Sequence, residues 1–279
     1  MLGLVNGAFY AMLSLGLAVI FGLLDIVNFA HGALYMVGAF VAWIMLDKWG
    51  VNFWFALVLA PLVVGAFGVA IERLFLKRLY GLDPLYGLLL TFGLSLILEG
   101  VFRDQYGVSG QSYPVPDLLA GATNLGFMIL PNYRAFVIVA SLVVCLGTWY
   151  LIERTRLGAY LRAGTENAKL VQAFGVNVPL MVMLTYGAGA GLAAMAGVLA
   201  APIIQVTPLM GSNLIIVVFA VVVIGGMGSI LGSVITGLLL GLVEGLTRVF
   251  YPEASNVVVF VIMVIVLVLR PAGLFGKEA

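Results

Sequence analysis

The chain has little of the chemistry on which metal proteins and many enzymes depend. Its 279 residues include one cysteine, Cys145, and one histidine, His31. A single cysteine excludes a disulfide within the chain and gives no support to a metal site built on cysteines. A single histidine argues equally against a histidine metal cluster. We therefore expect no metal site and no cofactor.

Motifs of common catalytic sites are also absent. The sequence contains no G-x-x-x-x-G-K-[ST] phosphate loop, no H-E-x-x-H and no G-x-S-x-G. The chain is therefore not expected to be an enzyme, and it needs a separate motor if its work consumes ATP. The net charge of +1 provides no strong field to attract nucleic acid.

Long apolar runs fill most of the sequence. Hydrophobic residues make up 63% of the chain, charged residues 9%, and the mean hydropathy is +1.20. A soluble domain of this length cannot bury so much apolar surface, whereas a bilayer accepts about 20 apolar residues per crossing. The sequence predicts an all-α, polytopic integral membrane helical bundle, with residues 1–279 forming a single transmembrane domain.

The apolar runs divide into nine segments, which give about 8–10 crossings. Two glycine-rich interruptions, near 25–32 and 225–232, predict broken or re-entrant helices. The predicted spans are 2–23, 33–47, 52–72, 85–102, 134–152, 180–201, 214–225, 231–249 and 256–270.

The basic residues gather in alternate gaps between these segments, which predicts an orientation. We expect a cell inner (plasma) membrane protein whose N-terminus is outside and whose C-terminus is in the cytoplasm, an orientation that places nine of the basic residues on the cytoplasmic side. These residues are Arg73, Lys77, Arg78, Arg154, Arg156, Arg162, Lys169, Arg270 and Lys277. The loop 103–133 is then external, and 153–179 is the largest cytoplasmic loop.

Charged residues within spans are costly and are therefore functional candidates. Glu244 lies deepest, and Arg248 follows four residues later on the same helix face, so the two are expected to pair. A role for Glu244 in a substrate pathway or a subunit contact is the alternative. Glu99 is expected to pair with Arg103 at the outer end of its span, and Glu72 to act as an anchor at an inner boundary.

The two interruptions are candidate gating or substrate-pathway elements, because irregular backbone at membrane depth lies within protein or beside a watery cavity. The alternative for each is a tight turn between two spans. The candidate residues are Asn28, His31, Gly32, Gly225, Gly226, Gly228 and Ser229.

The 153–179 loop predicts a short helix over 159–173, which Gly175 and Pro179 end. Such a helix beneath the membrane would suit docking of a soluble partner. The alternative is a positively charged anchor, which the basic residues of the loop would provide in any case.

Four stretches of the chain resemble, in order, the permease subunits of branched-chain amino acid ABC importers of the LivH/LivM type. They are Gly16-Leu17 with Phe21-Gly22 and Asn28-Phe29-Ala30-His31-Gly32; Arg156-Leu157-Gly158 with Arg162, Glu166 and Phe174-Gly175; Gly225-Gly226-Met227-Gly228-Ser229 with Glu244; and Arg270-Pro271-Ala272-Gly273-Leu274-Phe275-Gly276.

The resemblance implies a permease that pairs with a second permease subunit, the same or related. Two ATPase subunits would dock on Arg156, Gly158, Arg162, Glu166 and Gly175, and an external substrate-binding protein would deliver the cargo. Members of the family often carry a lysine where this chain has Val217, so a branched-chain amino acid, an amide or urea all stay open as substrates. An ion-coupled secondary transporter of a small polar solute and a structural membrane subunit are the competing hypotheses.

Overall fold

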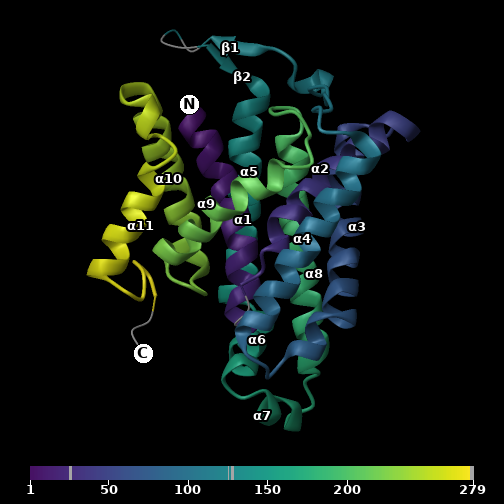
Figure 1. Cartoon of the computed structure of the whole chain (residues 1–279), viewed down its shortest axis with the longest axis vertical. Coiled ribbons are helices and arrows are strands. Elements are labelled where there is room, and N and C mark those ends of the chain that lie inside the picture. The colour runs from purple at the N-terminus through teal and green to yellow at the C-terminus, as the bar shows by residue number, and fades with distance from the viewer. Residues whose placement is uncertain (25–26, 125, 127–128, 277–279) are drawn as a thin grey trace.

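The computed structural model describes residues 1–24, 27–124, 126 and 129–276, which form a bundle of long helices (Figure 1). Each of the nine predicted apolar segments coincides with a helix. These helices are α1 (Leu2–Leu24), α2 (Ala30–Trp49), α3 (Phe53–Leu74), α4 (Pro84–Tyr106), α5 (Asn132–Arg154), α8 (Val178–Ala200), α9 (Met210–Gly225), α10 (Ile230–Phe250) and α11 (Val258–Leu269). The predicted polytopic helical bundle is confirmed.

The remaining elements lie in the connections. α6 (Arg156–Glu166) and α7 (Ala168–Ala173) join α5 to α8, and three short 3₁₀ helices occur at η1 (Leu76–Leu79), η2 (Asp117–Leu119) and η3 (Pro252–Ala254). The sequence did not predict the antiparallel hairpin of β1 (Ala122–Asn124) and β2 (Ile129–Pro131), in which Ala122 pairs with Pro131.

Seven helices of the described chain are long and apolar enough to cross a membrane, whereas α9 and α11 are shorter. With 16 and 12 residues, α9 and α11 extend about 24 and 18 Å, less than the hydrocarbon core of about 30 Å. The interruption near 225–232 follows α9 directly, because α9 ends at Gly225 and α10 begins at Ile230. The other falls between α1 and α2; its residues 25 and 26 lie outside the described part of the chain, as does Lys277.

α8 packs against α1, α2 and α3. Its small residues face backbone of three other helices: Gly189 lies against Gly16 of α1, Gly197 against Tyr35 of α2, and Gly187 against α3. A Cβ atom added to Gly189 would lie 3.1 Å from the Gly16 carbonyl oxygen. The row of small residues in α8 therefore serves close helix packing, as expected where lipid supplies no hydrophobic drive for association.

α1 and α10 form a second close contact through glycines on both helices. A Cβ atom on Gly3 would lie 2.6 Å from the Gly241 carbonyl oxygen, and one on Gly7 would lie 2.9 Å from that of Leu238. Gly237, Gly241 and Gly245 of α10, which are spaced four residues apart, therefore pack against α1. The spacing is visible in the sequence, but the helix that these glycines contact is not.

The outer faces of α3, α4 and α5 present large apolar side chains. Phe55 and Leu62 of α3, Leu89 of α4 and Val143 of α5 are each more than 60% exposed. In a soluble protein such surface would aggregate, whereas in a membrane protein it suits contact with lipid or with another membrane subunit.

The connecting segments divide between the two ends of the bundle. The β1–β2 hairpin lies at one end, and α6 and α7 lie at the other (Figure 1). η1 also lies at the α6–α7 end, where its Lys77 lines the same cavity as Gly164 of α6 and Ala168 of α7. The basic residues of the 73–78 and 154–169 segments therefore share one end, as the charge pattern predicted.

Candidate functional site

Three other helices hold the chain where α2 begins. The Asn28 side-chain amide donates to the Tyr186 hydroxyl at 3.1 Å, and the Phe29 backbone N–H donates to the Thr91 hydroxyl at 3.2 Å. His31 Nε2 lies 3.1 Å from the Leu13 carbonyl oxygen of α1. Because a carbonyl only accepts, the proton of this neutral ring is assigned to Nε2. The start of α2 is therefore tied to α1, α4 and α8.

His31 is completely buried, and its Nδ1 atom has no hydrogen-bond partner among the described residues. The Oδ1 atom of Asn28 is buried and unpartnered in the same way. Buried polar atoms without partners are costly, so the start of α2 carries unused hydrogen-bonding capacity inside the bundle.

Gly32 and Gly211 bring the start of α2 against the start of α9. A Cβ atom on Gly32 would lie 2.6 Å from the Gly211 carbonyl oxygen and 2.9 Å from the Ile215 side chain. A methyl group at Gly32 would therefore push α9 away. The glycine is explained by this backbone contact, and the sequence did not reveal Gly211 as its partner.

The glycine-rich turn between α9 and α10 is closed by the C-terminal segment. Leu274 N–H donates to the Ile224 carbonyl at 2.8 Å, and Phe275 N–H donates to that of Gly225 at 3.1 Å. Gly226 has a φ of +99°, in the region that side chains disfavour. The Ser229 hydroxyl begins α10 by accepting from the Gly232 N–H at 3.1 Å.

Glu244 is buried, with three side-chain donors around its carboxylate. Arg248 donates at 2.6 Å, as the i,i+4 spacing predicted. Two further donors come from α1: the Tyr10 hydroxyl at 2.5 Å and the Asn6 amide at 3.4 Å. The carboxylate therefore ties α10 to α1 beside their glycine contact, and Tyr10 and Asn6 are partners that the sequence did not reveal.

Residues 156–175, called the docking segment here, contain two helices, α6 and α7. The expected single helix over 159–173 is therefore wrong. Asn167 interrupts it, because its side chain accepts from the Leu170 N–H at 3.0 Å and thereby caps a new helix, α7. Arg156 and Glu166 are the exposed first and last residues of α6. Gly175, with a φ of +83°, follows α7 in a left-handed conformation.

α6 folds back against the end of α5. Gly158 is buried against the Ile152 carbonyl with no room for a side chain. Arg162 donates to that carbonyl at 3.0 Å and forms an ion pair of 3.4 Å with Glu153. The ion pair is about half exposed, so it adds little stability, and the backbone contact at Gly158 fixes the angle.

The structure brings two of the predicted regions together. A cavity of about 90 Å³ lies between the docking segment and the glycine turn, lined by Leu161 and Arg162 on one side and by Gly228 on the other, with Gly22 of α1 between them. Glu244 is not brought to this place. Its partners Asn6 and Tyr10 lie in the first turns of α1, whereas Gly22 lies near the end of that helix.

The expectations for Glu99 and Glu72 are corrected. Glu99 is buried and accepts from Ser95 at 3.3 Å, and no ion pair with Arg103 occurs in the described chain. Glu72 is 2% exposed and accepts from the Tyr80 hydroxyl at 2.6 Å, while the neighbouring Arg73 is exposed. Both carboxylates lie on the helix face that points into the bundle.

Comparison with known proteins gives a match along almost the whole chain. The family described as "Branched-chain amino acid transport system / permease component" matches residues 1–267. The chain is 31% identical to the high-affinity branched-chain amino acid transport system permease protein BraD of Pseudomonas aeruginosa, over 99% of this chain and 94% of the relative. It is 29% identical to the corresponding protein LivH of Escherichia coli K12, over the same shares of each chain.

An archaeal relative extends the likeness. The probable branched-chain amino acid transport permease protein LivH of Methanocaldococcus jannaschii is 29% identical over 96% of this chain and 88% of its own length. No solved structure matches the chain. The segments that form the start of α2, the docking segment and the α9–α10 turn all lie within the matched range, and the chain belongs to the family of branched-chain amino acid transport permease components.

Proposed function

We propose that this chain is a membrane-spanning permease subunit of an ATP-driven importer for branched-chain or related amino acids. In this proposal the whole chain, residues 1–279, is one transmembrane domain in the cell inner membrane. A second permease subunit completes the pathway, two ATPase subunits supply the energy, and an external binding protein delivers the cargo. The match to the permease family over residues 1–267 is the observation that carries the proposal.

The end of the bundle that carries α6 and α7 is proposed to face the cytoplasm, and the β1–β2 end to face outside. The gathering of basic residues at the α6–α7 end supports this orientation. The ATPase subunits would then grip the exposed residues of α6 and the turn at Gly175. A push on α6 would reach the α9–α10 turn across the small cavity between Arg162 and Gly228.

Asn28, His31 and Gly32 are proposed to act as a gating element together with the Gly225–Ser229 turn. Support comes from the Asn28 Oδ1 and His31 Nδ1 atoms, which have no partner among the described residues and could each accept a hydrogen bond when α2 moves. The contact between Gly32 and Gly211 would transmit that movement to α9, which leads directly into the turn.

The competing hypothesis of an ion-coupled secondary transporter requires a carboxylate that exchanges protons or sodium. Glu244 has three donors, one of which is its ion-pair partner Arg248, and this favours a structural carboxylate. The purified chain reconstituted alone should therefore show no uptake under an imposed H⁺ or Na⁺ gradient. Uptake should require the ATPases, the binding protein and any second permease. Gradient-driven uptake by the lone chain, lost in Glu244→Gln, would refute the proposal.

Docking is tested by reversing one exposed charge. Glu166→Lys at the end of α6 should leave the protein inserted but uncouple ATP hydrolysis from uptake in the assembled transporter. Asp117→Lys makes the same charge change in exposed η2, in the loop proposed to be external, and should leave coupling intact. Normal substrate-stimulated hydrolysis and uptake in Glu166→Lys would reduce the segment to a membrane anchor.

A further inference from the structure

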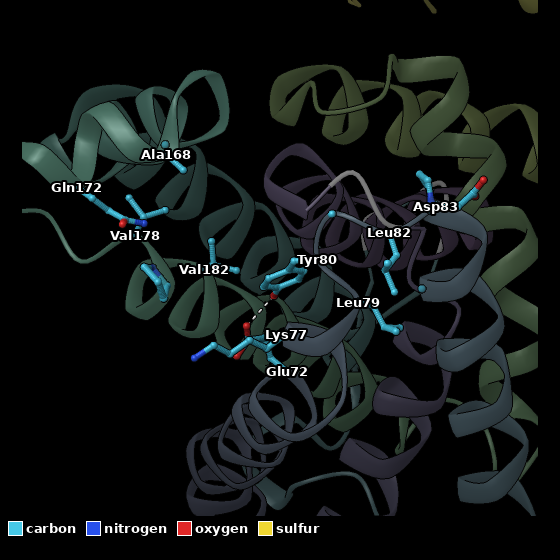
Figure 2. A pocket seen from close by; sticks show the side chains of 15 residues that line it. Glu72, Lys77, Leu79, Tyr80, Leu82, Asp83, Ala168, Gln172, Val178 and Val182 are labelled. Atoms are coloured by element: carbon cyan, nitrogen blue, oxygen red, sulfur yellow. Dashed lines mark hydrogen bonds between the residues drawn. The ribbon is translucent and has the colours of Figure 1, made fainter.

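A cavity of about 490 Å³ opens at the α6–α7 end of the bundle, beside the docking segment, whose Gly164, Ala168 and Gln172 form part of its lining. One wall is the 77–84 segment between α3 and α4, and the other is formed by α7 and the start of α8. Figure 2 shows Tyr80 next to Val182, with Val178 and Gln172 further along the opposite wall. The volume falls within the range of small-molecule sites.

One carboxylate in this cavity is buried and only partly satisfied. Glu72 lines the cavity and is 2% exposed, and Tyr80 donates to its Oε1 atom at 2.6 Å (Figure 2). Its other oxygen, Oε2, receives no hydrogen bond from the described residues and stays open to the cavity, and no ion pair reaches Glu72 in the described chain. A carboxylate that is largely enclosed and has no cation beside it attracts positive charge, so a positively charged group that entered the cavity would be favoured at Oε2.

The phenol of Tyr80 adds no second negative charge beside Glu72. Burial, and then the hydrogen bond to Glu72, raise the pKa of Tyr80, so the phenol stays neutral and donates its proton. It therefore holds one carboxylate oxygen in place and leaves the other for a ligand.

A cation and an apolar surface lie beside this carboxylate. Lys77 lines the same cavity on an exposed, flexible stem, and Leu79, Leu82, Val178, Pro179 and Val182 give the lining its apolar part. A second cavity of about 200 Å³ is also lined by Glu72, Lys77 and Pro179. The site thus offers a fixed negative group, a mobile positive group and an aliphatic wall.

We propose that this cavity binds the zwitterion of a small aliphatic α-amino acid, with Glu72 accepting from its ammonium group and Lys77 pairing with its carboxylate. This inference rests on the proposed function for two points, namely that this end faces the cytoplasm and that the imported cargo, which accumulates there, is an amino acid. A ligand here would join the 77–84 segment to α7 and α8 and so restrain the docking segment. The consequence is feedback: a filled internal pool slows ATP-driven import.

Binding is tested on the full chain in lipid nanodiscs, without ATPase or binding protein, using tritiated L-leucine as the probe. Saturable binding is expected, and Glu72→Gln and Lys77→Met should each weaken it about tenfold or more, the effect of losing one charged hydrogen bond. Arg78→Met is the matched control, because Arg78 is the exposed neighbour of Lys77 and does not line the cavity. It should bind like the unmodified chain.

The chemical class of the ligand is tested by competition against leucine. 3-Methylbutylamine lacks the carboxylate and 4-methylpentanoate lacks the ammonium group, so each should compete at least about tenfold more weakly than unlabelled leucine. Lack of saturable leucine binding, or equal binding by the chain and by Lys77→Met, overturns the proposal. Lys77 is exposed, so this variant is informative even if Glu72→Gln does not fold.

Feedback is measured in proteoliposomes that hold the assembled transporter with its ATPases outward. The readout is the ratio of ATP hydrolysis with and without leucine on the ATPase side. The ratio should fall below one in the unmodified transporter and return to one in Lys77→Met. If nanodisc binding holds and no ATP-driven uptake occurs, the proposed function fails and the site stands. Uptake without leucine binding rejects the site and leaves the proposed function intact.

Discussion

The buried carboxylate of Glu244 should stabilise the pairing of α1 with α10 through Tyr10, and a double-mutant cycle can measure this. The variants are Tyr10→Phe, Glu244→Met and the pair. Phenylalanine removes only the hydroxyl donor. Methionine keeps about the length of the glutamate side chain but removes the carboxylate oxygens that accept the hydrogen bonds. Both positions are buried and lie 2.5 Å apart at their polar atoms.

The magnitude follows from what each change leaves behind. Tyr10→Phe leaves a carboxylate with two donors, and a hydrogen bond to a charged group contributes about 1.5–3 kcal/mol in water-soluble proteins. Within membranes measured interhelical values are smaller, on average about 0.6 kcal/mol with a maximum near 1.7. We expect about 1 kcal/mol for Tyr10→Phe. Glu244→Met should cost more, because it also strands the Tyr10 hydroxyl and releases Arg248.

The double variant should therefore lose about 1 kcal/mol less than the sum of the single variants, because the stranded hydroxyl is absent from it. The free energy of unfolding is measured by titrating the purified chain from dodecylmaltoside into mixed micelles with sodium dodecyl sulfate. Arg248→Met is the control for the exposed side of the pair and should cost less than about 1 kcal/mol. Strictly additive single effects would show that the Tyr10–Glu244 contact contributes nothing.

Two further predictions concern topology and packing. In a chain with Cys145→Ser, a cysteine at Thr155 should react with a membrane-impermeant thiol label only from the cytoplasm. A cysteine at Gly110 should react only from outside, and labelling of it from the cytoplasm would overturn the orientation. Gly32→Ala should lower the midpoint of unfolding, because its methyl group meets Gly211. Gly93→Ala in α4 is the control and should not lower the midpoint, because its methyl group enters open space. Equal midpoints for the two variants would contradict the close contact of α2 with α9.

The positions of the helices could be predicted because membrane spans are defined by length and hydropathy. The break at Asn28–Gly32 and the stop at Gly225 were visible for the same reason, since each interrupts an apolar run. The inward or outward direction of a side chain was not visible. In a soluble helix the apolar face marks the interior, but here lipid and protein interior are equally apolar, so Glu99 and Glu72 gave no sign of pointing inward.

Partners across the bundle were equally hidden. Tyr10 and Glu244 are 234 residues apart in the sequence, and Gly32 meets Gly211 only because α2 and α9 begin side by side. Local signals predict where a backbone bends, and they do not say which distant segment meets the bend. Asn167 is different, because an asparagine in the middle of a predicted helix is a local signal for a cap. The helix-forming residues on both sides of it led to the prediction of one continuous helix.

The hydrogen bonds from Leu274 and Phe275 to the last carbonyls of α9 also bear on how the protein is made. Those carbonyls lack partners within their own helix and belong to buried residues, so they need donors from another segment of the chain. They receive their donors only after residue 275 has left the ribosome, when α9, α10 and α11 have already been synthesised. Closure of the α9–α10 turn is therefore a late step of biogenesis. A nascent chain truncated after α11 should present an unfinished turn that a membrane quality-control protease can recognise.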